Sequence, residues 1–144
     1  MKYLALVVFN VMIIPMFFLV YSTDSEDIVI NITCKDFMKL NPGSIIHKEV
    51  RFESGEMMKV ILYSNPTTGF QWELKKISEP SVLKKMKQKY EASDDKKKSG
   101  AHGIEIWTFK ALKKGKSLVH MQYRRSWEKD AKSKWSVVFA VDVE

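Results

Sequence analysis

Residues 64–72 read SNPTTGFQW and connect two strand-like stretches, of which the first is the apolar run 57–63, MMKVILY. An Asn-Pro pair, two threonines and a glycine at such a junction predict a short loop of fixed geometry. Pro66 holds its own φ at about −65° and keeps Asn65 out of the helical region. Gly69 can take a positive φ at no steric cost, so we expect the chain to turn back there. A plain hairpin connection would need no more than this, so the loop alone does not identify a ligand.

The composition is that of one globular domain with an appendage. The chain has 144 residues, and 45% of them are hydrophobic, which is enough for a core and too much for a disordered chain. Cys34 is the only cysteine, so no intramolecular disulfide can form and the core must hold the fold together. Because Cys34 follows a strand pattern, we expect a small buried hydrophobe rather than a nucleophile.

The net charge of +7 comes from lysine-rich stretches. Such an excess suits a nucleic acid or an acidic partner protein. No zinc-finger, helix-turn-helix or RNA-recognition signature accompanies the lysines, so we expect no nucleic-acid partner. The basic residues concerned are Lys84, Lys85, Lys87, Lys89, 96–98, Lys113, Lys114, Lys116, Arg124 and Arg125.

Residues 1–22, MKYLALVVFNVMIIPMFFLVYS, have the pattern of a secretory signal peptide. Val20 and Ser22 fit the small-residue cleavage pattern, which predicts a cut after Ser22. The apolar run is also long enough for an uncleaved anchor, but Asn10 and Pro15 within it and the polar residues after it favour cleavage. We therefore expect a mature chain of charge +6, free of the membrane, that is either secreted or held in a lysosomal or phagosomal compartment.

Two Asn-x-Thr tripeptides differ in what they allow. Asn31 begins Asn-Ile-Thr and is a predicted glycosylation site, whereas Asn65 is excluded because Pro66 takes the middle position. The Asn65 loop would therefore stay bare. Residues 23–43 form an N-terminal extension to which the alternating isoleucines at 28–32 assign one strand.

Short strand patterns separated by turn residues predict an all-β fold, a β-sandwich of seven or eight strands. Within this series, the apolar residues of 82–90 fall at helical spacing and predict one or two helical turns. Trp72, Trp107 and Trp135 are expected in the core, whereas Trp127 precedes a charged loop. The expected strands are 28–32, 45–52, 57–63, 70–77, 104–111, 117–124 and 135–143.

Three segments together resemble the chagasin family, the inhibitors of papain-like cysteine peptidases. The first, NPTTGFQW at 65–72, matches the family's N-P-T-T-G-[FY]-x-W segment in full. The second, GAHG at 100–103, leads into WTFKA at 107–111, where the family has G-x-G-G and then W-x-F-x-A. The third, YRRSWE at 123–128, compares with Y-x-R-P-W. Order and spacing agree over about residues 44–144, which we expect to be the inhibitor domain.

The resemblance implies an immunoglobulin-like β-sandwich with three loops at one end, and these loops form a wedge that enters a peptidase cleft. The first loop would lie at the catalytic cysteine with Thr67 and Thr68 at its tip, the second on the non-primed side and the third on the primed side. The implied partners are papain-like, cathepsin-like cysteine peptidases, bound reversibly and tightly by a monomer without a cofactor or metal. The implied contact residues are Asn65, Pro66, Thr67, Thr68, Gly69, Phe70, Gly100, Ala101, His102, Gly103, Arg125, Ser126 and Trp127.

Two residues depart from the family pattern. His102 replaces a glycine, at a position where a positive φ or a close backbone approach would favour glycine. Ser126 replaces a proline, so the third loop loses one fixed dihedral angle. Both changes are expected to loosen or reshape binding without abolishing it.

Two other functional classes are alternatives to a peptidase inhibitor: an enzyme and a binding module. His47, His102 and His120 are scattered, and the chain lacks G-x-S-x-G, H-E-x-x-H, a phosphate-binding glycine loop and a Cys/His metal set, so we expect no enzyme. A secreted immunoglobulin-like adhesion or receptor-binding module would share the sandwich, because fold does not fix function. Such a module would have no use for all three loop motifs together.

Overall fold

A computed structural model describes residues 26–93 and 102–144 of the chain. These residues form eight β-strands, one short α-helix and one 3₁₀ turn. No helix within the described residues is long and apolar enough to span a bilayer. In chain order the elements are β1 (Ile28–Ile32), α1 (Cys34–Met38), β2 (Ser44–Phe52), β3 (Met57–Ser64), η1 (Pro66–Thr68), β4 (Gln71–Ile77), β5 (Leu83–Ala92), β6 (Gly103–Ala111), β7 (Gly115–Arg124) and β8 (Trp135–Val143).

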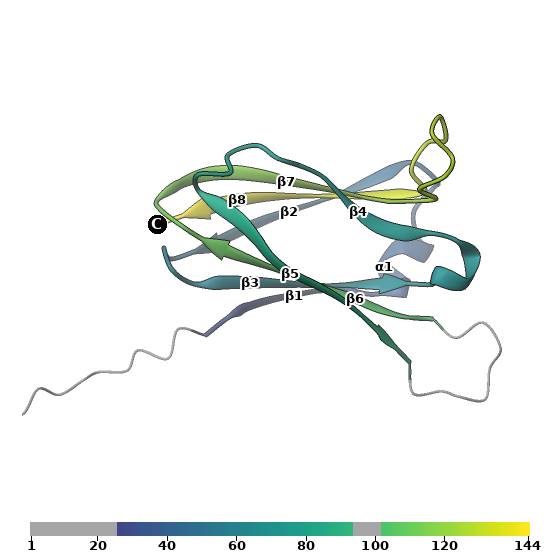
Figure 1. Cartoon of the computed structure of the whole chain (residues 1–144), viewed down its shortest axis with the longest axis horizontal. Coiled ribbons are helices and arrows are strands. Elements are labelled where there is room, and N and C mark those ends of the chain that lie inside the picture. The colour runs from purple at the N-terminus through teal and green to yellow at the C-terminus, as the bar shows by residue number, and fades with distance from the viewer. Residues whose placement is uncertain (1–25, 94–101) are drawn as a thin grey trace, which may run out of the picture.

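The strands form two four-stranded sheets that pack face to face (Figure 1). One sheet has the order β1-β3-β6-β5 and the other the order β2-β8-β7-β4. β1 runs parallel to β3 and β2 parallel to β8, and the remaining neighbours are antiparallel. The predicted all-β, immunoglobulin-like sandwich is confirmed.

The core lies between the sheets and follows from the two-residue period of the strands. Along β8, the inward side chains of Val137, Phe139, Val141 and Val143 are all buried. The expectation that three tryptophans lie in the core is also confirmed. Those tryptophans are Trp72, Trp107 and Trp135.

The prediction of helical turns over 82–90 is wrong, because Leu83–Ala92 is the strand β5. β5 lies at the edge of its sheet and pairs with β6 alone, so its outer residues carry no apolar alternation. A register shift between Lys85 and Lys87 interrupts the two-residue period still further. Met86 and Tyr90, which gave the helical spacing, are both exposed.

Residues before β2 add more than the one strand that their pattern predicts. After β1, Asp36 accepts hydrogen bonds from the backbone nitrogen and the hydroxyl of Thr33, both at 2.8 Å, and these bonds start the short helix α1. Phe37 on α1 is completely buried, with its ring 4.7 Å from that of Trp135. Cys34 is only half-buried, which corrects the expectation of a buried cysteine. The predicted signal peptide lies outside the described residues.

Candidate binding site at the loop edge

Three segments that are distant in the sequence lie at one end of the sandwich, on the right in Figure 1. The pairing of Ser64 with Gly103 puts the start of β6 beside the end of β3. The pairing of Gln71 with Arg124 puts the loop after β7 beside the start of β4. We call this end the loop edge. It brings together the predicted peptidase-contact residues except Gly100 and Ala101, which lie outside the described residues.

The 65–70 loop is ordered by its own polar groups. Its middle forms the 3₁₀ turn η1, and the amide of Gly69 donates to the carbonyl of Pro66 at 2.9 Å. The Thr67 hydroxyl donates to the Asn65 side-chain oxygen at 2.5 Å, and the Thr68 hydroxyl donates to the Asn65 carbonyl at 2.6 Å. Gly69 has a φ of +80°, so the expected turn at this glycine is confirmed. Residues 66–68 are exposed, so these hydrogen bonds within the loop, rather than burial, hold its shape.

Buried groups beneath the loop fix its two ends. The Asn65 amide donates to the Tyr123 hydroxyl at 2.8 Å. The carboxylate of Glu105 accepts from the Ser64 hydroxyl at 2.8 Å and from the Trp72 amide at 3.1 Å, so one buried group joins both flanking strands. Sequence reasoning missed Glu105. The available signal was the two-residue period of β6, which puts Glu105 on the same face as the core residues Trp107 and Phe109.

Tyr123 is also the centre of an aromatic cluster. Its ring lies 5.4 Å from Phe70, 5.1 Å from Trp72 and 5.3 Å from Trp135. Burial raises the pKa of the Tyr123 hydroxyl, the charge of Glu105 adds to the rise, and the hydrogen bond from Asn65 opposes it. The hydroxyl therefore stays neutral at ordinary pH and serves as the acceptor for the loop.

The third segment contacts the first directly. Arg125 donates from Nε to the Thr68 carbonyl at 3.2 Å, and its guanidinium carbon lies 4.6 Å from the centre of the Phe70 ring. The Trp127 ring lies against Gly69 so closely that a Cβ on this glycine would be 2.2 Å from the ring carbon Cη2. Trp127 is nevertheless 65% exposed. Arg125 and Trp127 thus join two loops, and the Trp127 side chain remains largely exposed.

The base of the third segment is held by charged groups. Arg124 donates from Nη2 to the Glu128 carbonyl at 2.8 Å, and its Nε lies 3.7 Å from a carboxylate oxygen of Glu73. Arg125 also donates from Nη1 to the Glu128 carboxylate at 3.1 Å. Ser126 stands exposed at the turn between these anchored residues.

In the second segment, His102 is exposed and Gly103 is buried. No non-glycine residue in the described part of the chain has a positive φ, so the backbone of His102 does not need the freedom of glycine. A Cβ at Gly103, by contrast, would lie 2.2 Å from the Glu91 carbonyl oxygen. The requirement for glycine therefore falls on position 103.

Solved structures with this fold include cysteine protease inhibitors. EhICP2 from Entamoeba histolytica, a cysteine protease inhibitor, is 21% identical with a TM-score of 0.59, and the match covers 81% of this chain and 96% of that chain. PbICP-C, solved in complex with falcipain-2, is 17% identical with a TM-score of 0.55, covering 81% and 99%. Amebosin is 23% identical with a TM-score of 0.55, covering 72% and 99%. At these identities the likeness is one of fold.

Family membership follows from comparison of the sequence rather than of the fold. A search of curated proteins finds no match. The model of the chagasin family peptidase inhibitor I42 matches residues 51–143. The chain therefore belongs to the chagasin family, a family of peptidase inhibitors rather than enzymes, and the resemblance seen in the three motifs is confirmed.

Proposed function

We propose that the protein is a reversible, tight-binding inhibitor of papain-like cysteine peptidases and that its loop edge occludes the active-site cleft. The observation that carries the proposal is the pre-ordered tip, in which both threonine hydroxyls bond within the 65–70 loop and Arg125 and Trp127 cover it. Because the loop is already ordered, little conformational entropy is lost on binding.

The shape of the loop suits inhibition rather than cleavage. A peptide in a 3₁₀ turn does not offer a scissile carbonyl in the extended form that a peptidase cleaves. The Thr68 carbonyl is also occupied by Arg125. Trp127 supplies an exposed aromatic anchor of the type that dominates interface energies. A wedge of three segments can bury about 1,600 Å², which is ordinary for a protease–inhibitor pair.

The proposal includes the cellular setting that the sequence suggests. A monomer would act on cathepsin-like peptidases in the secretory pathway, either secreted or within a lysosomal or phagosomal compartment. Two features support this. The first 22 residues have a signal-peptide pattern, and Asn31, the predicted glycosylation site, is exposed on β1.

The test is a titration of papain with residues 23–144 and with two variants. The unaltered protein should inhibit reversibly and remain intact by mass spectrometry. Trp127→Ala should weaken inhibition by about 1–3 kcal/mol with only a small change in Tm, because the side chain is 65% exposed and lies against Gly69. Leu118→Ala, which removes another exposed apolar side chain far from the edge, should change neither value. Absence of inhibition at micromolar protein would refute the proposal.

A further inference from the structure

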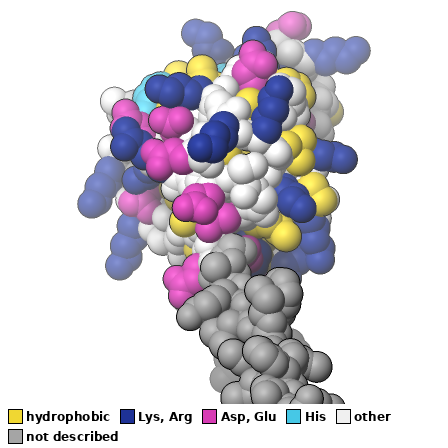
Figure 2. Space-filling view, turned by 90° about the vertical axis from the view of Figure 1, so that its left-hand side faces the viewer, with side chains coloured by type: hydrophobic (Ala, Val, Ile, Leu, Met, Phe, Trp, Pro, Cys, Tyr) yellow, Lys and Arg dark blue, Asp and Glu magenta, His cyan; other side chains and the backbone are white. Residues whose placement is uncertain are grey.

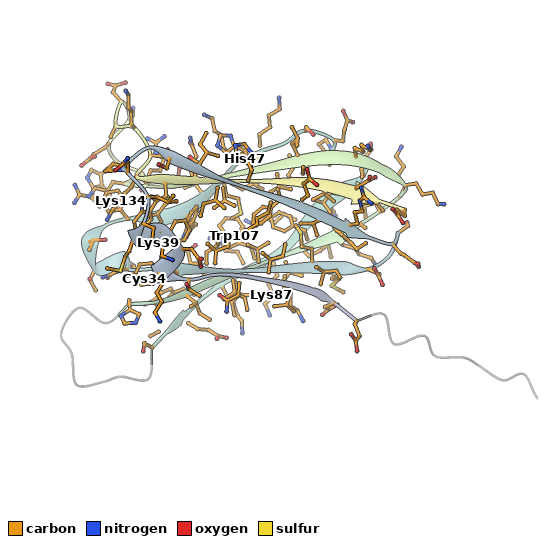
Figure 3. The ribbon with its side chains drawn as sticks, turned by 180° about the vertical axis from the view of Figure 1, so that it is seen from behind. Cys34, Lys39, His47, Lys87, Trp107 and Lys134 are labelled. Carbon is orange, nitrogen blue, oxygen red and sulfur yellow. The ribbon has the colours of Figure 1, made fainter. Side chains whose placement is uncertain are left out.

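Four lysines form a row on the outer face of the sheet β1-β3-β6-β5. We call Lys84, Lys87 and Lys89 of β5, together with Lys110 of β6, the lysine row. All residues of β5 after Leu83 are exposed. Figure 3 shows Lys87 on the outside of this sheet, whereas Trp107 lies between the two sheets.

The register shift in β5 is what aligns the row. In a regular strand, Lys84 would share a face with residues 86 and 88, and Lys87 and Lys89 would point the other way. Because the shift falls between Lys85 and Lys87, Lys84 instead pairs with Lys110, Lys87 with Thr108 and Lys89 with Ile106. These partners alternate with the buried core residues of β6. All three β5 lysines therefore lie on the outer face.

The row places like charges side by side. Lys84 stands directly opposite Lys110, an arrangement that destabilises a pair of strands. Within the described residues, the one ion pair made by the row joins Lys89 to Glu91. At the end of the sandwich nearest the C-terminus, basic side chains surround a group of acidic ones (Figure 2). The row has no such balance.

Protection of a sheet edge explains only part of this arrangement. Lysines on an edge strand do prevent pairing with other chains. Lys110 lies on the inner strand β6, however, and edge protection requires neither this lysine nor a shift that brings three lysines to one face. A bound polyanion would neutralise Lys84, Lys87 and Lys110, which make no ion pair with the described residues.

We propose that the lysine row binds a sulfated polysaccharide. Lys84 to Lys89 span about 16 Å of strand, so the row suits an extended chain of negative charges. It consists of ammonium groups without an arginine fork, and these bind sulfate as point charges. The row has no aromatic ring on which a nucleic-acid base could stack. The large exposed apolar residues of β5 are Met86 at the register shift and Tyr90 on the opposite face, and these two are too few for membrane insertion.

The experiment compares three mature proteins on heparin. Lys84→Gln/Lys87→Gln/Lys89→Gln removes most of the row. Lys75→Gln/Lys76→Gln/Lys116→Gln removes the same charge from exposed positions on the other sheet. We expect the row variant to raise the Kd for heparin at least tenfold and to reduce the slope of log Kd against log salt by about 2, while the control changes Kd less than threefold. Papain inhibition should not change in either variant, since the loop edge is intact.

A single substitution distinguishes loss of the heparin site from misfolding of the variant. Lys84→Glu creates an opposite-charge pair with Lys110, so its Tm should rise slightly while heparin affinity falls. Equal losses of affinity in the row and control triples would overturn the proposal, because net charge alone would then explain binding. It would also be overturned if heparin were not retained, or if single-stranded DNA or anionic vesicles bound more tightly than heparin at equal charge concentration.

Discussion

At the scale of single residues, Gly69 combines a positive φ with a close contact from the side chain of another loop. Its φ is +80°, and the Trp127 ring occupies the space of a side chain. Gly69→Ala should therefore cost about 1–3 kcal/mol of stability and displace Trp127, which we expect to weaken papain inhibition at least tenfold. Gly55→Ala is the matched control, because Gly55 has a φ of +94° with no atom within 4 Å of a new Cβ. The control should lose similar stability and keep full inhibition; a similar loss of inhibition in both variants would contradict the role given to the Trp127 contact.

Tyr123 links the order of the loop to pH. Burial raises its pKa above the value of about 10 that it has in the unfolded chain. Below pH 10 both states hold the proton and its contribution to stability is complete. Above about pH 10 the unfolded chain loses the proton first, so stability falls until the pKa of the folded state is passed.

Tyr123→Phe should remove this dependence and leave the Asn65 amide without its acceptor. We expect a loss of about 0.5–1.5 kcal/mol at pH 7, weaker inhibition, and a shallower decline of the unfolding free energy above pH 10. Urea unfolding from pH 7 to 11 measures the stability loss and the pH dependence, and a titration of papain measures the inhibition. Some decline should remain, because burial also raises the pKa of Tyr63. An unchanged slope would show that Tyr123 titrates alike in both states.

At the scale of elements, the turn at residues 125–128 is the part of the loop edge that can be made more rigid. The Glu128 amide donates to the Arg125 carbonyl at 3.3 Å, so Ser126 stands at the second position of a four-residue turn, where proline is favoured. Ser126→Pro should raise stability by about 0.4–1 kcal/mol and lower the inhibition constant several-fold, because the free chain has less freedom to lose. Inhibition constants and Tm values give both readouts. A loss of inhibition would mean that the third loop must adjust on binding.

An element could be predicted from the sequence where its own residues determine its backbone, and could not where contacts with distant residues determine it. The 65–70 loop was predictable because Pro66 and Gly69 fix its backbone through their own chemistry. β5 was not, since an edge strand takes its form from the neighbour β6 and a register shift hides its period. Glu105 was not singled out, because its role appears only when β3 and β4 meet over β6. The motifs thus identified the surface of the site, and tertiary contacts supplied its support.

At the scale of the whole molecule, a fold without disulfides must hold its loop edge through core packing. The family match begins at residue 51, yet β1, α1 and most of β2 precede it. α1 lies at the same end of the sandwich as the loops (Figure 1), and Phe37 packs on both Trp72 and Trp135. The residues before the family match therefore complete the core on which the loop edge stands.

Phe37→Ala tests this dependence. The side chain is fully buried in the aromatic cluster, so its loss should reduce the free energy of unfolding by about 3–5 kcal/mol, measured in urea. Met38→Ala is the matched control on the same helix, because Met38 is 75% exposed and should cost less than about 0.5 kcal/mol. At a temperature where Phe37→Ala is still folded, its inhibition of papain should weaken, since Trp72 and Trp135 support the Tyr123 ring that binds the 65–70 loop. If Phe37→Ala were as stable as Met38→Ala, the N-terminal residues would be an appendage to a sandwich complete without them.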